Sequence, residues 1–392
     1  MKRAVITGIG AVAGNASGKE QLFETCTNGI SGIKKCTAFN TDGLLTDRFG
    51  ECELSEENRL YELIRLSSVE MLADAGVDTR YISAAGGRCR LCIGTLLSTT
   101  DNAYKHSVEK SEGISNSGSL ASMNDYISYT KKIFGVKGSV SVSSAACASG
   151  ASAAGMAFDY IRNGVCDMVV MGGADPLTIT AAYGFNSLKS LSSCVCNPYD
   201  ENRDGINIGE CGAYFLVEEL EHARERNARI YCEIAGYGLG NDAYHATSPD
   251  PEGNGAYNTM LMALADGKIS ADSVDYINGH GTGTVINDSM EVKAIERLFE
   301  NTDKIPALSS TKAILGHCMG ASGAIELAST IMSMINGKYI PMPRLSSPIT
   351  DGKKIFISSL TKDIDIKYAL SNSFAFAGNS ASLLIKSYEE GE

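Results

Sequence analysis

The sequence predicts an α/β protein built from two similar halves, and three observations support this prediction. The chain has 392 residues, enough for two domains or one large duplicated unit. Strand-like runs alternate along it with helix-like runs, a pattern typical of sheets covered by helices. Two segments also resemble each other at an offset of 173 residues, one beginning at Ala148 and the other at Ala321.

The strand-like runs are short and largely apolar. Helical periodicity appears between them, over residues 58–76, 289–301 and 324–337. This alternation indicates sheets that are largely buried. In chain order the strand-like runs are RAVITGIG (3–10), RLCIGTLL (90–97), GSVSVSSA (138–145), DMVVMGGAD (167–175), GAYFLVEEL (212–220), RIYCEIAGYG (229–238), VDYINGHGTGT (274–284), KIFISSL (354–360) and ASLLIKSY (381–388).

The two similar segments read ASGASAAGMAFDYIRNG and ASGAIELASTIMSMING. Each opens with Ala-Ser-Gly, continues for the length of a helix and closes on Asn-Gly, a helix-stop signal. Coincidence between two Ala-rich helices explains the likeness as readily as duplication of an α/β half does. With duplication the boundary falls near Ala228, so the halves span residues 1–228 and 229–392.

Composition argues against several classes of function. The net charge is −12, from 34 Lys and Arg residues against 46 Asp and Glu residues, whereas a nucleic-acid partner requires a basic surface. No apolar run approaches the roughly 20 residues of a membrane span. The opening MKRAVITGIG reaches its first glycine too early for a signal peptide. We therefore expect a cytoplasmic protein with neither a nucleic-acid nor a membrane partner.

The 12 cysteines do not suggest a metal site. Cys89 and Cys92 form a Cys-x-x-Cys pair, but they lie in a strand-like run, where positions three apart face opposite sides of a sheet. The other close pair is Cys194 and Cys196. Because the thiols of Cys89 and Cys92 cannot converge on one ion, and Cys194 with Cys196 is the one other close pair, we expect no metal. In a cytosolic chain of this size the cysteines are also more often reduced than bridged.

Cys147 lies in SSAACASGASAAG, thirteen residues without a charged, aromatic or large side chain. Considered alone, it is either a small core residue or a nucleophile. A nucleophile needs small neighbours, because a substrate carbonyl and backbone N–H groups must reach its sulfur. Cys147 directly precedes a predicted helix, Ala148 to Asn163. We expect the dipole of that helix to lower the pKa of the thiol and its unpaired N–H groups to stabilise an oxyanion.

A second motif reads INGHGTGTVINDSMEVKAIE. It places His280 between two glycines at the end of a strand, and Thr282 and Thr284 follow. A lone histidine is more often structural than catalytic. A histidine in a Gly-rich strand end with hydroxyls beside it is a better candidate for catalysis.

Two further motifs lie nearer the C-terminus. STKAILGHCMGASGAIE carries Lys312, His317 and Glu326, with His317 in the turn that opens the second repeated helix. NSFAFAGNSASLLI is a small-residue loop that holds Phe374 and Phe376 and is followed by a final strand.

These four motifs, in this order, resemble those of the elongating β-ketoacyl-acyl-carrier-protein synthases of the thiolase superfamily. The resemblance runs from VITGIG to ASLLI and includes residues 197–228. It implies a thiolase-like fold, with duplicated α/β halves in a five-layered αβαβα arrangement. It also implies an acyltransferase that performs a decarboxylative Claisen condensation. The acyl thioester would combine with malonyl-acyl-carrier protein to give a 3-oxoacyl-acyl-carrier protein, in fatty acid or polyketide and polyene chain elongation.

The resemblance also implies catalytic roles. Cys147 would carry the acyl chain as a thioester. His280 and His317 would hydrogen-bond the malonyl thioester carbonyl and stabilise the enolate left by carbon dioxide. Lys312, paired with Glu326, would orient His317 and add positive potential.

The remaining implied roles concern substrate binding. The amides of Cys147 and Phe376 would form an oxyanion hole for the acyl thioester, and Phe376 would act as a gate. Thr282 and Thr284 would bind the phosphopantetheine arm, and Phe374 would line the substrate site. We expect no cofactor of the protein's own, because the acyl carrier protein brings the arm.

The chain departs from the family in several places, and the stretch before Pro198 is a few residues short. The gate loop usually reads Phe-Gly-Phe-Gly-Gly-Thr-Asn, whereas here Ala375 and Ala377 replace two glycines. Because alanine at φ > 0 is costly, we expect a stiffer loop. Near the expected acyl pocket, GTLLSTTDN carries Leu96 and Leu97, where the family often has glycine beside one apolar residue. Both changes predict a specialised acyl-chain preference.

Other classes fit less well. A thiolase-type coenzyme A acyltransferase uses a second cysteine near its C-terminus, whereas the last cysteine here is Cys318. A starter-unit synthase would carry His and Asn rather than two His. A chain-length factor would lack the nucleophile. The alternative we retain first is the catalytic ketosynthase subunit of a heterodimer with a non-catalytic chain-length factor.

The expected partners are an acyl carrier protein and a second subunit, in a homodimer or in a heterodimer with a ketosynthase-like chain-length factor. Carrier proteins are generally acidic, and so is this chain, so docking requires a local basic patch. Lys131, Lys132 and Lys137 form one of the few basic clusters and are our candidates for that patch.

Overall fold

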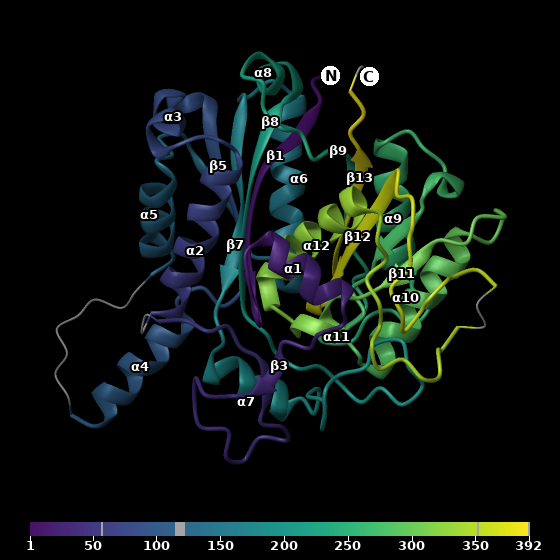
Figure 1. Ribbon diagram of the computed structural model, residues 1–392. Helices are drawn as coiled ribbons and strands as arrows, with labels where there is room; N and C mark the ends of the chain where they lie inside the picture. The colour runs from purple at the N-terminus through teal and green to yellow at the C-terminus, as the bar shows by residue number, and fades with distance from the viewer. Residues whose placement is uncertain (56–57, 114–121, 351–352, 391–392) are drawn as a thin grey trace.

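A mixed sheet of eleven strands runs through the protein (Figure 1). The computed structural model describes residues 1–55, 58–113, 122–350 and 353–390. The main path of the sheet is β11-β10-β12-β13-β9-β1-β8-β7-β5-β6, and β2 lies beside β1. A small separate sheet joins β3 (Ile33–Lys35) to β4 (Arg48–Gly50). The strands of the large sheet are β1 (Ala4–Ala13), β2 (Ala16–Ser17), β5 (Cys89–Gly94), β6 (Val140–Ser143), β7 (Met168–Asp175), β8 (Cys211–Glu219), β9 (Cys232–Asn241), β10 (Tyr276–Asn278), β11 (Ala307–Ser309), β12 (Tyr368–Phe374) and β13 (Asn379–Ser387).

The strand order of the first half repeats in the second. Outward from the centre, the first half reads β1, β8, β7, β5, β6 and the second reads β9, β13, β12, β10, β11. In both halves the two inner contacts are antiparallel and the two outer contacts are parallel. β1 and β9 join the halves as antiparallel neighbours. Duplication of an α/β unit explains this order, and Ala228 lies between α8 (Leu220–Glu225) and β9.

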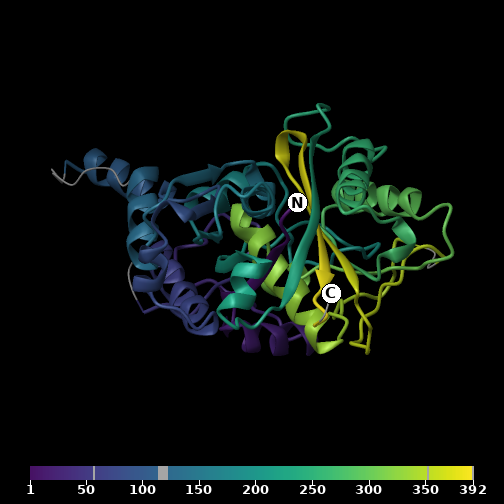
Figure 2. The ribbon, with the colours of Figure 1, turned by 90° about the horizontal axis from the view of Figure 1, so that it is seen from above.

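Helices cover both faces of each half, which gives the five-layered αβαβα arrangement (Figure 2). The middle layer contains α1, α6 and α12, whereas α2, α3 and α5 cover the first half and α9 and α10 the second. No helix in the described part of the chain is both long and apolar enough to cross a membrane. The helices are α1 (Lys19–Thr27), α2 (Arg59–Asp74), α3 (Thr79–Ala84), α4 (Thr100–Ser111), α5 (Met123–Phe134), α6 (Ser149–Arg162), α7 (Ile179–Ser187), α9 (Asn254–Asp266), α10 (Val285–Leu298), α11 (Lys312–Leu315) and α12 (Ser322–Asn336).

The repeated Ala-Ser-Gly segments have a packing cause. They lie where the N-terminal ends of α6 and α12 meet. A Cβ on Gly150 would lie 2.7 Å from the backbone nitrogen of Ala324, and a Cβ on Gly323 would lie 2.5 Å from that of Ala151. Only glycine permits so close an approach of two backbones. The repeat therefore brings together the two helix starts that follow Cys147 and His317.

Each of these helices follows a short 3₁₀ turn with a strained residue. The turns are η2 (Ala146–Ala148) before α6 and η4 (Met319–Ala321) before α12. Ala146 has φ of 50° and Met319 has φ of 48°, and the two residues are related by the same 173-residue offset. A positive φ is unfavourable for residues with a Cβ and is common at functional turns. In both halves, therefore, a residue with an unfavourable positive φ precedes the helix of the middle layer.

Two sequence predictions about strands were wrong. KIFISSL forms no strand, and only Phe356 makes an isolated bridge, to Ala307. Conversely, β12 ends with residues 372–374, which we expected to form part of a loop. Its Ser371, Asn372 and Ser373 are fully buried, and Asn372 accepts a hydrogen bond from Ser382 on β13 (2.7 Å). Buried polar side chains made this strand resemble a loop in the sequence.

Candidate active site

Cys147, His280 and His317 come together from three separate elements. Cys147 lies in η2, His280 follows β10, and His317 precedes η4. The sulfur of Cys147 and one ring nitrogen of each histidine lie within 4.8 Å of one another, and all three residues are buried. The two imidazole rings meet edge to face, with centroids 5.4 Å apart. The structure therefore unites the three principal residues that the sequence singled out.

The electrostatics of Cys147 differ from the expectation. Burial raises the pKa of its thiol to about 11, while the nearby Lys312 ammonium acts in the opposite direction. We expected the helix dipole to lower this pKa, and that prediction was wrong because desolvation of the thiolate outweighs it. The thiol is therefore protonated in the ligand-free protein at neutral pH.

The Nζ of Lys312 lies within hydrogen-bonding distance of His280, whereas the resemblance implied that Lys312 orients His317. Its Nζ lies 3.2 Å from Nδ1 of His280 and also donates a hydrogen bond to the carboxylate of Glu326. Lys312 and Glu326 are both buried. Because an ammonium group can only donate, Nδ1 of His280 is the acceptor. The sequence predicted the pairing of Lys312 with Glu326. It did not predict that Lys312 orients His280.

His317 is held by its own turn. Its Nδ1 accepts a hydrogen bond from the backbone N–H of Met319 (3.1 Å) and lies 3.1 Å from the hydroxyl oxygen of Ser322. Burial and the charge of Lys312 lower the pKa of both His280 and His317 well below the ordinary value, so both imidazoles are neutral. Since Nδ1 of each ring is an acceptor, Nε2 carries the proton. The pair thus offers two Nε2–H donors.

Two carboxylates that the sequence analysis did not assign fix the loop of His280. Glu291 accepts the backbone N–H groups of His280 and Gly281, both at 2.8 Å, and Asp288 accepts that of Thr282 at 3.0 Å. Both carboxylates are fully buried on α10. Burial raises the pKa of Glu291 to about 7. Their spacing of three residues, on a helix that follows a Gly-rich strand end, is the signal that would have revealed them.

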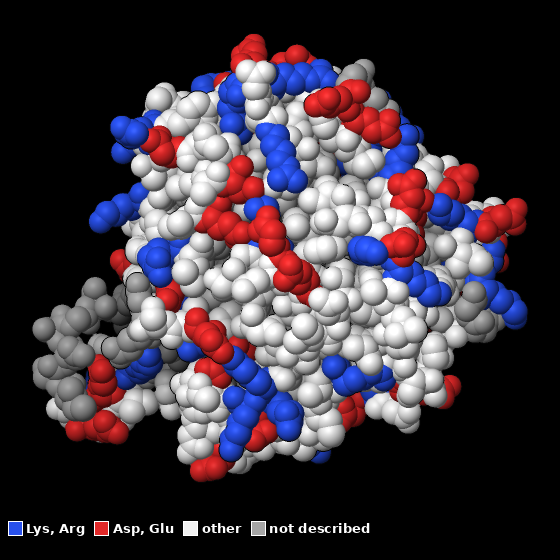
Figure 3. Space-filling model, viewed as in Figure 1, with Lys and Arg blue, Asp and Glu red and all other residues white. Residues whose placement is uncertain are grey.

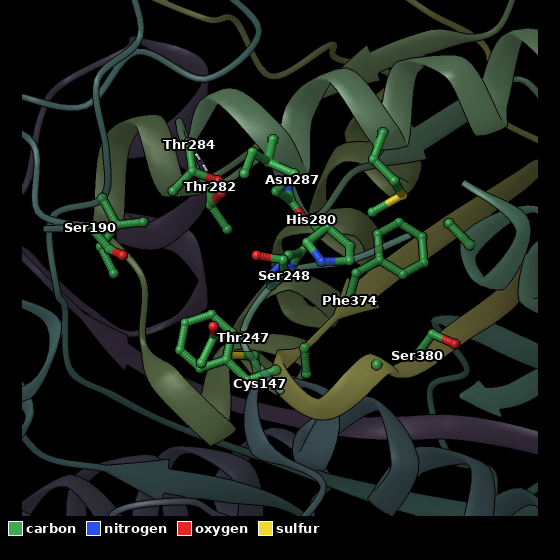
Figure 4. Close-up of a pocket in the computed structure, with 18 of the residues that line it drawn as sticks. Cys147, Ser190, Thr247, Ser248, His280, Thr282, Thr284, Asn287, Phe374 and Ser380 are labelled. Carbon is green, nitrogen blue, oxygen red and sulfur yellow. Dashed lines mark hydrogen bonds between the residues drawn. The ribbon is translucent and has the colours of Figure 1, made fainter. Parts of the chain in front are cut away.

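Cys147, His280 and His317 line a pocket of about 380 Å³ (Figure 4). Thr282 and Thr284 line it, with their hydroxyl oxygens 2.9 Å apart. Phe374 also lines it, and its ring lies 6.2 Å from that of His280, centroid to centroid. Phe376 lines it as well and stacks on Phe185 of α7 at 5.6 Å. Four residues that we expected to bind substrate therefore face one space with Cys147.

Leu96 and Leu97 lie outside the lining of this pocket. Leu97 is buried in a separate apolar cluster that includes Leu177 and Met319. The backbone N–H groups of Leu96 and Leu97 donate to the buried carboxylate of Asp175, at 2.9 and 3.0 Å. Asp175 thus holds the turn that contains Leu96 and Leu97 beside η4. That turn is not part of the wall of the described pocket.

The gate loop confirms one of the two expected backbone strains. Ala377 has φ of 59°, the left-handed conformation that glycine adopts easily, whereas Ala375 is extended, with φ of −127°. The N–H of Ala377 donates to the carbonyl of Ala246 at 2.8 Å, and its carbonyl accepts from the side chain of Asn241 at 2.7 Å. The loop is therefore joined to the segment after β9, and the strain is confined to Ala377.

Comparison with known proteins agrees with this geometry. Residues 45–223 match the N-terminal domain of β-ketoacyl synthases, and residues 231–346 match the C-terminal domain of the same family. The 3-oxoacyl-[acyl-carrier-protein] synthase 2 of Staphylococcus aureus (strain COL) is 32% identical, over 99% of this chain and 99% of its own.

Solved structures extend the comparison. One is a type II polyketide synthase ketosynthase in complex with its acyl carrier protein (28% identity, TM-score 0.90). Another is the ishigamide ketosynthase/chain length factor (27% identity, TM-score 0.90). Each alignment covers 99% of this chain and 100% of the other. With matches along nearly its whole length, the chain belongs to the β-ketoacyl synthase family of condensing enzymes, the ketosynthases.

Proposed function

We propose that this protein condenses an acyl group held on Cys147 with a malonyl unit held on an acyl carrier protein, releasing carbon dioxide and a 3-oxoacyl-carrier protein. The observation that carries the proposal is the pair of neutral imidazoles, His280 and His317, each of which has one ring nitrogen within 4.8 Å of the Cys147 sulfur and carries its proton on Nε2, because Nδ1 accepts a hydrogen bond. Two donors at one point suit a negative charge that develops on a single oxygen.

The first half-reaction loads the protein. The Cys147 sulfur forms a bond to the acyl carbonyl carbon, and the bond from that carbon to the carrier's sulfur breaks. The proton lost by the Cys147 thiol ends on the leaving carrier thiol, so no net proton is released. We assign the oxyanion of this step to the amides of Cys147 and Phe376, because both residues line the pocket at the thiol.

The second half-reaction makes the carbon–carbon bond. Cleavage of the bond between the malonyl methylene and its carboxylate releases carbon dioxide and leaves an enolate, whose oxygen His280 and His317 would hold. The enolate carbon then attacks the acyl carbonyl on Cys147, and the carbon–sulfur bond breaks. Because the pKa of this thiol is raised to about 11, the departing thiolate takes up a proton readily.

We propose that Thr282 and Thr284 bind the carrier's phosphopantetheine arm, which passes their paired hydroxyls on its way to Cys147.

We propose no resident cofactor or metal. Cys147, His280 and His317 are a possible ligand set, but the protonated Nε2 atoms present no lone pair to an ion. All twelve cysteines are unpaired, which supports a reducing compartment such as the cytoplasm.

We propose a dimer that forms at β6. This strand ends the main path of the sheet, pairs there with β5, and has half-buried side chains. An exposed edge of this kind invites pairing with another chain. A heterodimer is the second candidate, because a ketosynthase/chain length factor pair has the same fold at 27% identity.

Reconstitution tests the proposed reaction. The purified protein is mixed with an acyl-carrier protein and then with malonyl-carrier protein, and each step is followed by mass spectrometry. We expect one acyl group on Cys147, followed by carbon dioxide and a 3-oxoacyl-carrier protein. Cys147→Ser should lose the adduct and the product while keeping its fold. An adduct on another cysteine, or product formation by Cys147→Ser, would contradict the proposal.

A further inference from the structure

The mouth of the Cys147 pocket exposes an apolar rim, which we define as Leu188, Val285 and Ile286. These side chains are 48%, 58% and 50% exposed, and all three line the pocket. Leu188 ends α7, and Val285 and Ile286 open α10. Large apolar side chains grouped at the opening of a site are an indication of a binding surface.

The backbone holds the two parts of the rim in place. Ile206 donates to the carbonyl of Ser190 at 2.8 Å, and Gly205 donates to that of Gly283 at 3.0 Å. The guanidinium of Arg203 also donates to the carbonyl of Val285 at 2.8 Å. The segment 203–206 thus links the end of α7 to the start of α10. These hydrogen bonds therefore hold the residues of the rim in fixed positions relative to one another.

The charges that line the pocket give an acidic partner no attraction. They are one cation, Lys189, and three carboxylates, Asp204, Asp242 and Asp250. A backbone hydrogen bond from Glu252 helps to hold the pKa of Asp250 below its ordinary value, so that group is ionised. Elsewhere, on the face seen in Figure 3, positive and negative side chains are interspersed and neither sign covers the surface.

The basic cluster that we predicted lies elsewhere. Lys131 and Lys132 belong to α5, which packs on α2 and α3 in the outer layer, and the Nζ of Lys131 donates to the carbonyl of Gly138 at 3.1 Å. Neither these residues nor Lys137 line the pocket. A carrier seated at the mouth would meet the apolar rim directly.

We propose that the acyl carrier protein docks on this rim through apolar side chains of its own, so that recognition depends little on charge. The inference rests on the proposed function, because a partner that delivers its substrate on an arm must sit where the arm enters. Apolar contact is indifferent to ionic strength, whereas attraction between exposed charges weakens as salt screens them.

The test uses a triple variant with the rim made polar but uncharged, Leu188→Gln, Val285→Thr and Ile286→Gln. The matched control is Val69→Thr on α2, since Val69 is 59% exposed and lies away from the pocket. We expect the triple variant to raise KM for carrier-bound substrate about tenfold, and to change KM for a short pantetheine thioester less than about twofold. The control should match the wild type on both substrates.

Two further measurements separate the outcomes. Wild-type KM for carrier-bound substrate should change less than about twofold between about 50 and about 500 mM salt, and charge reversal at Lys131 and Lys132 should leave it unchanged. Calorimetric titration with the phosphopantetheinylated carrier should show the same loss of affinity in the triple variant, whatever the turnover. Equal effects on both substrates, steep salt dependence, or loss of docking in the lysine variant would overturn the proposal. Absence of product from either substrate, with carrier binding intact, would instead contradict the proposed reaction.

Discussion

The Nζ of Lys312 lies 3.2 Å from Nδ1 of His280, although His317 is far nearer to it in sequence. Neighbouring parallel strands explain this contact. β10 and β11 pair Asn278 with Ser309, and His280 and Lys312 each follow shortly after the end of its strand. The buried cation thus fixes one imidazole, while the other depends on the backbone of its own turn. The two histidines are chemically alike but differently supported.

Removing the charge of Lys312 should make Cys147 less reactive. Lys312 lowers the thiol pKa against the larger effect of burial, so Lys312→Met should raise that pKa above about 11. A rise of about one unit would slow alkylation by iodoacetamide about tenfold at fixed pH, because only the thiolate reacts.

The control for this prediction is the double variant Lys312→Met with Glu326→Gln. It removes the carboxylate that would otherwise be buried without its partner. Because Lys312 lowers the thiol pKa more than the Glu326 carboxylate raises it, alkylation should be slower than in the wild type in both variants, and less slowed in the double variant, while the protein stays folded by circular dichroism. An unchanged alkylation rate would show that the Lys312 charge does not act on Cys147.

Malonyl decarboxylation should persist into mildly acidic solution. The pKa values of His280 and His317 are lowered well below the ordinary value of 6.5 by burial and by Lys312. Both rings therefore stay neutral, with Nε2–H available, as the pH falls through 6.5, and they protonate only when the pH reaches their lowered values. Release of carbon dioxide from malonyl-carrier protein, measured from about pH 7.5 to about pH 6, should show no loss centred near 6.5. A half-maximal rate near pH 6.5 would contradict the assigned protonation states.

His280→Ala should separate the two half-reactions. In the proposed reaction, loading uses the Cys147 thiol and the oxyanion amides, whereas carbon dioxide release uses the imidazole donors. We expect the acyl-Cys147 adduct to form and condensation to fall by about 10²-fold to 10³-fold, the usual effect of losing one oxyanion donor. His106→Ala on α4 is the matched control and should behave as the wild type. Loss of loading with decarboxylation intact would reverse the assignment.

Sequence alone predicted the fold class and the principal residues because both rest on local patterns. The Ala-Ser-Gly repeat reflects the contact of Gly150 with α12, and the Gly-rich segment around His280 reflects a crowded strand end. The features that the sequence analysis did not predict depend on contacts between residues far apart in the chain. The thiol pKa of Cys147 follows from burial by the whole fold, and the Lys312–His280 contact follows from strand pairing. The polar strand β12 became recognisable only through its partners.

Ala377→Gly should change acyl-chain preference, whereas Ala375→Gly should not. Replacement of two glycines by alanine predicts a stiffer loop, but the structure places positive φ only at Ala377, in the conformation where Phe376 stacks on Phe185. Glycine at position 377 should stabilise that conformation by about 1 kcal/mol, because the left-handed region costs alanine about that much.

The consequence of Ala377→Gly is measurable in the loading step. If Phe376 gates the pocket, as the family resemblance implies, a long acyl chain displaces it from its stack to reach Cys147, and the ratio of long-chain to short-chain loading rates should fall about fivefold, the equivalent of about 1 kcal/mol. Asn241→Ala removes a hydrogen bond that joins this loop to the end of β9, and it should raise the ratio instead. Rates of adduct formation on Cys147, measured by mass spectrometry across a series of acyl lengths, check both directions. If Ala375→Gly lowered the ratio as much as Ala377→Gly, backbone flexibility of the loop, and not the positive φ of Ala377, would set the preference.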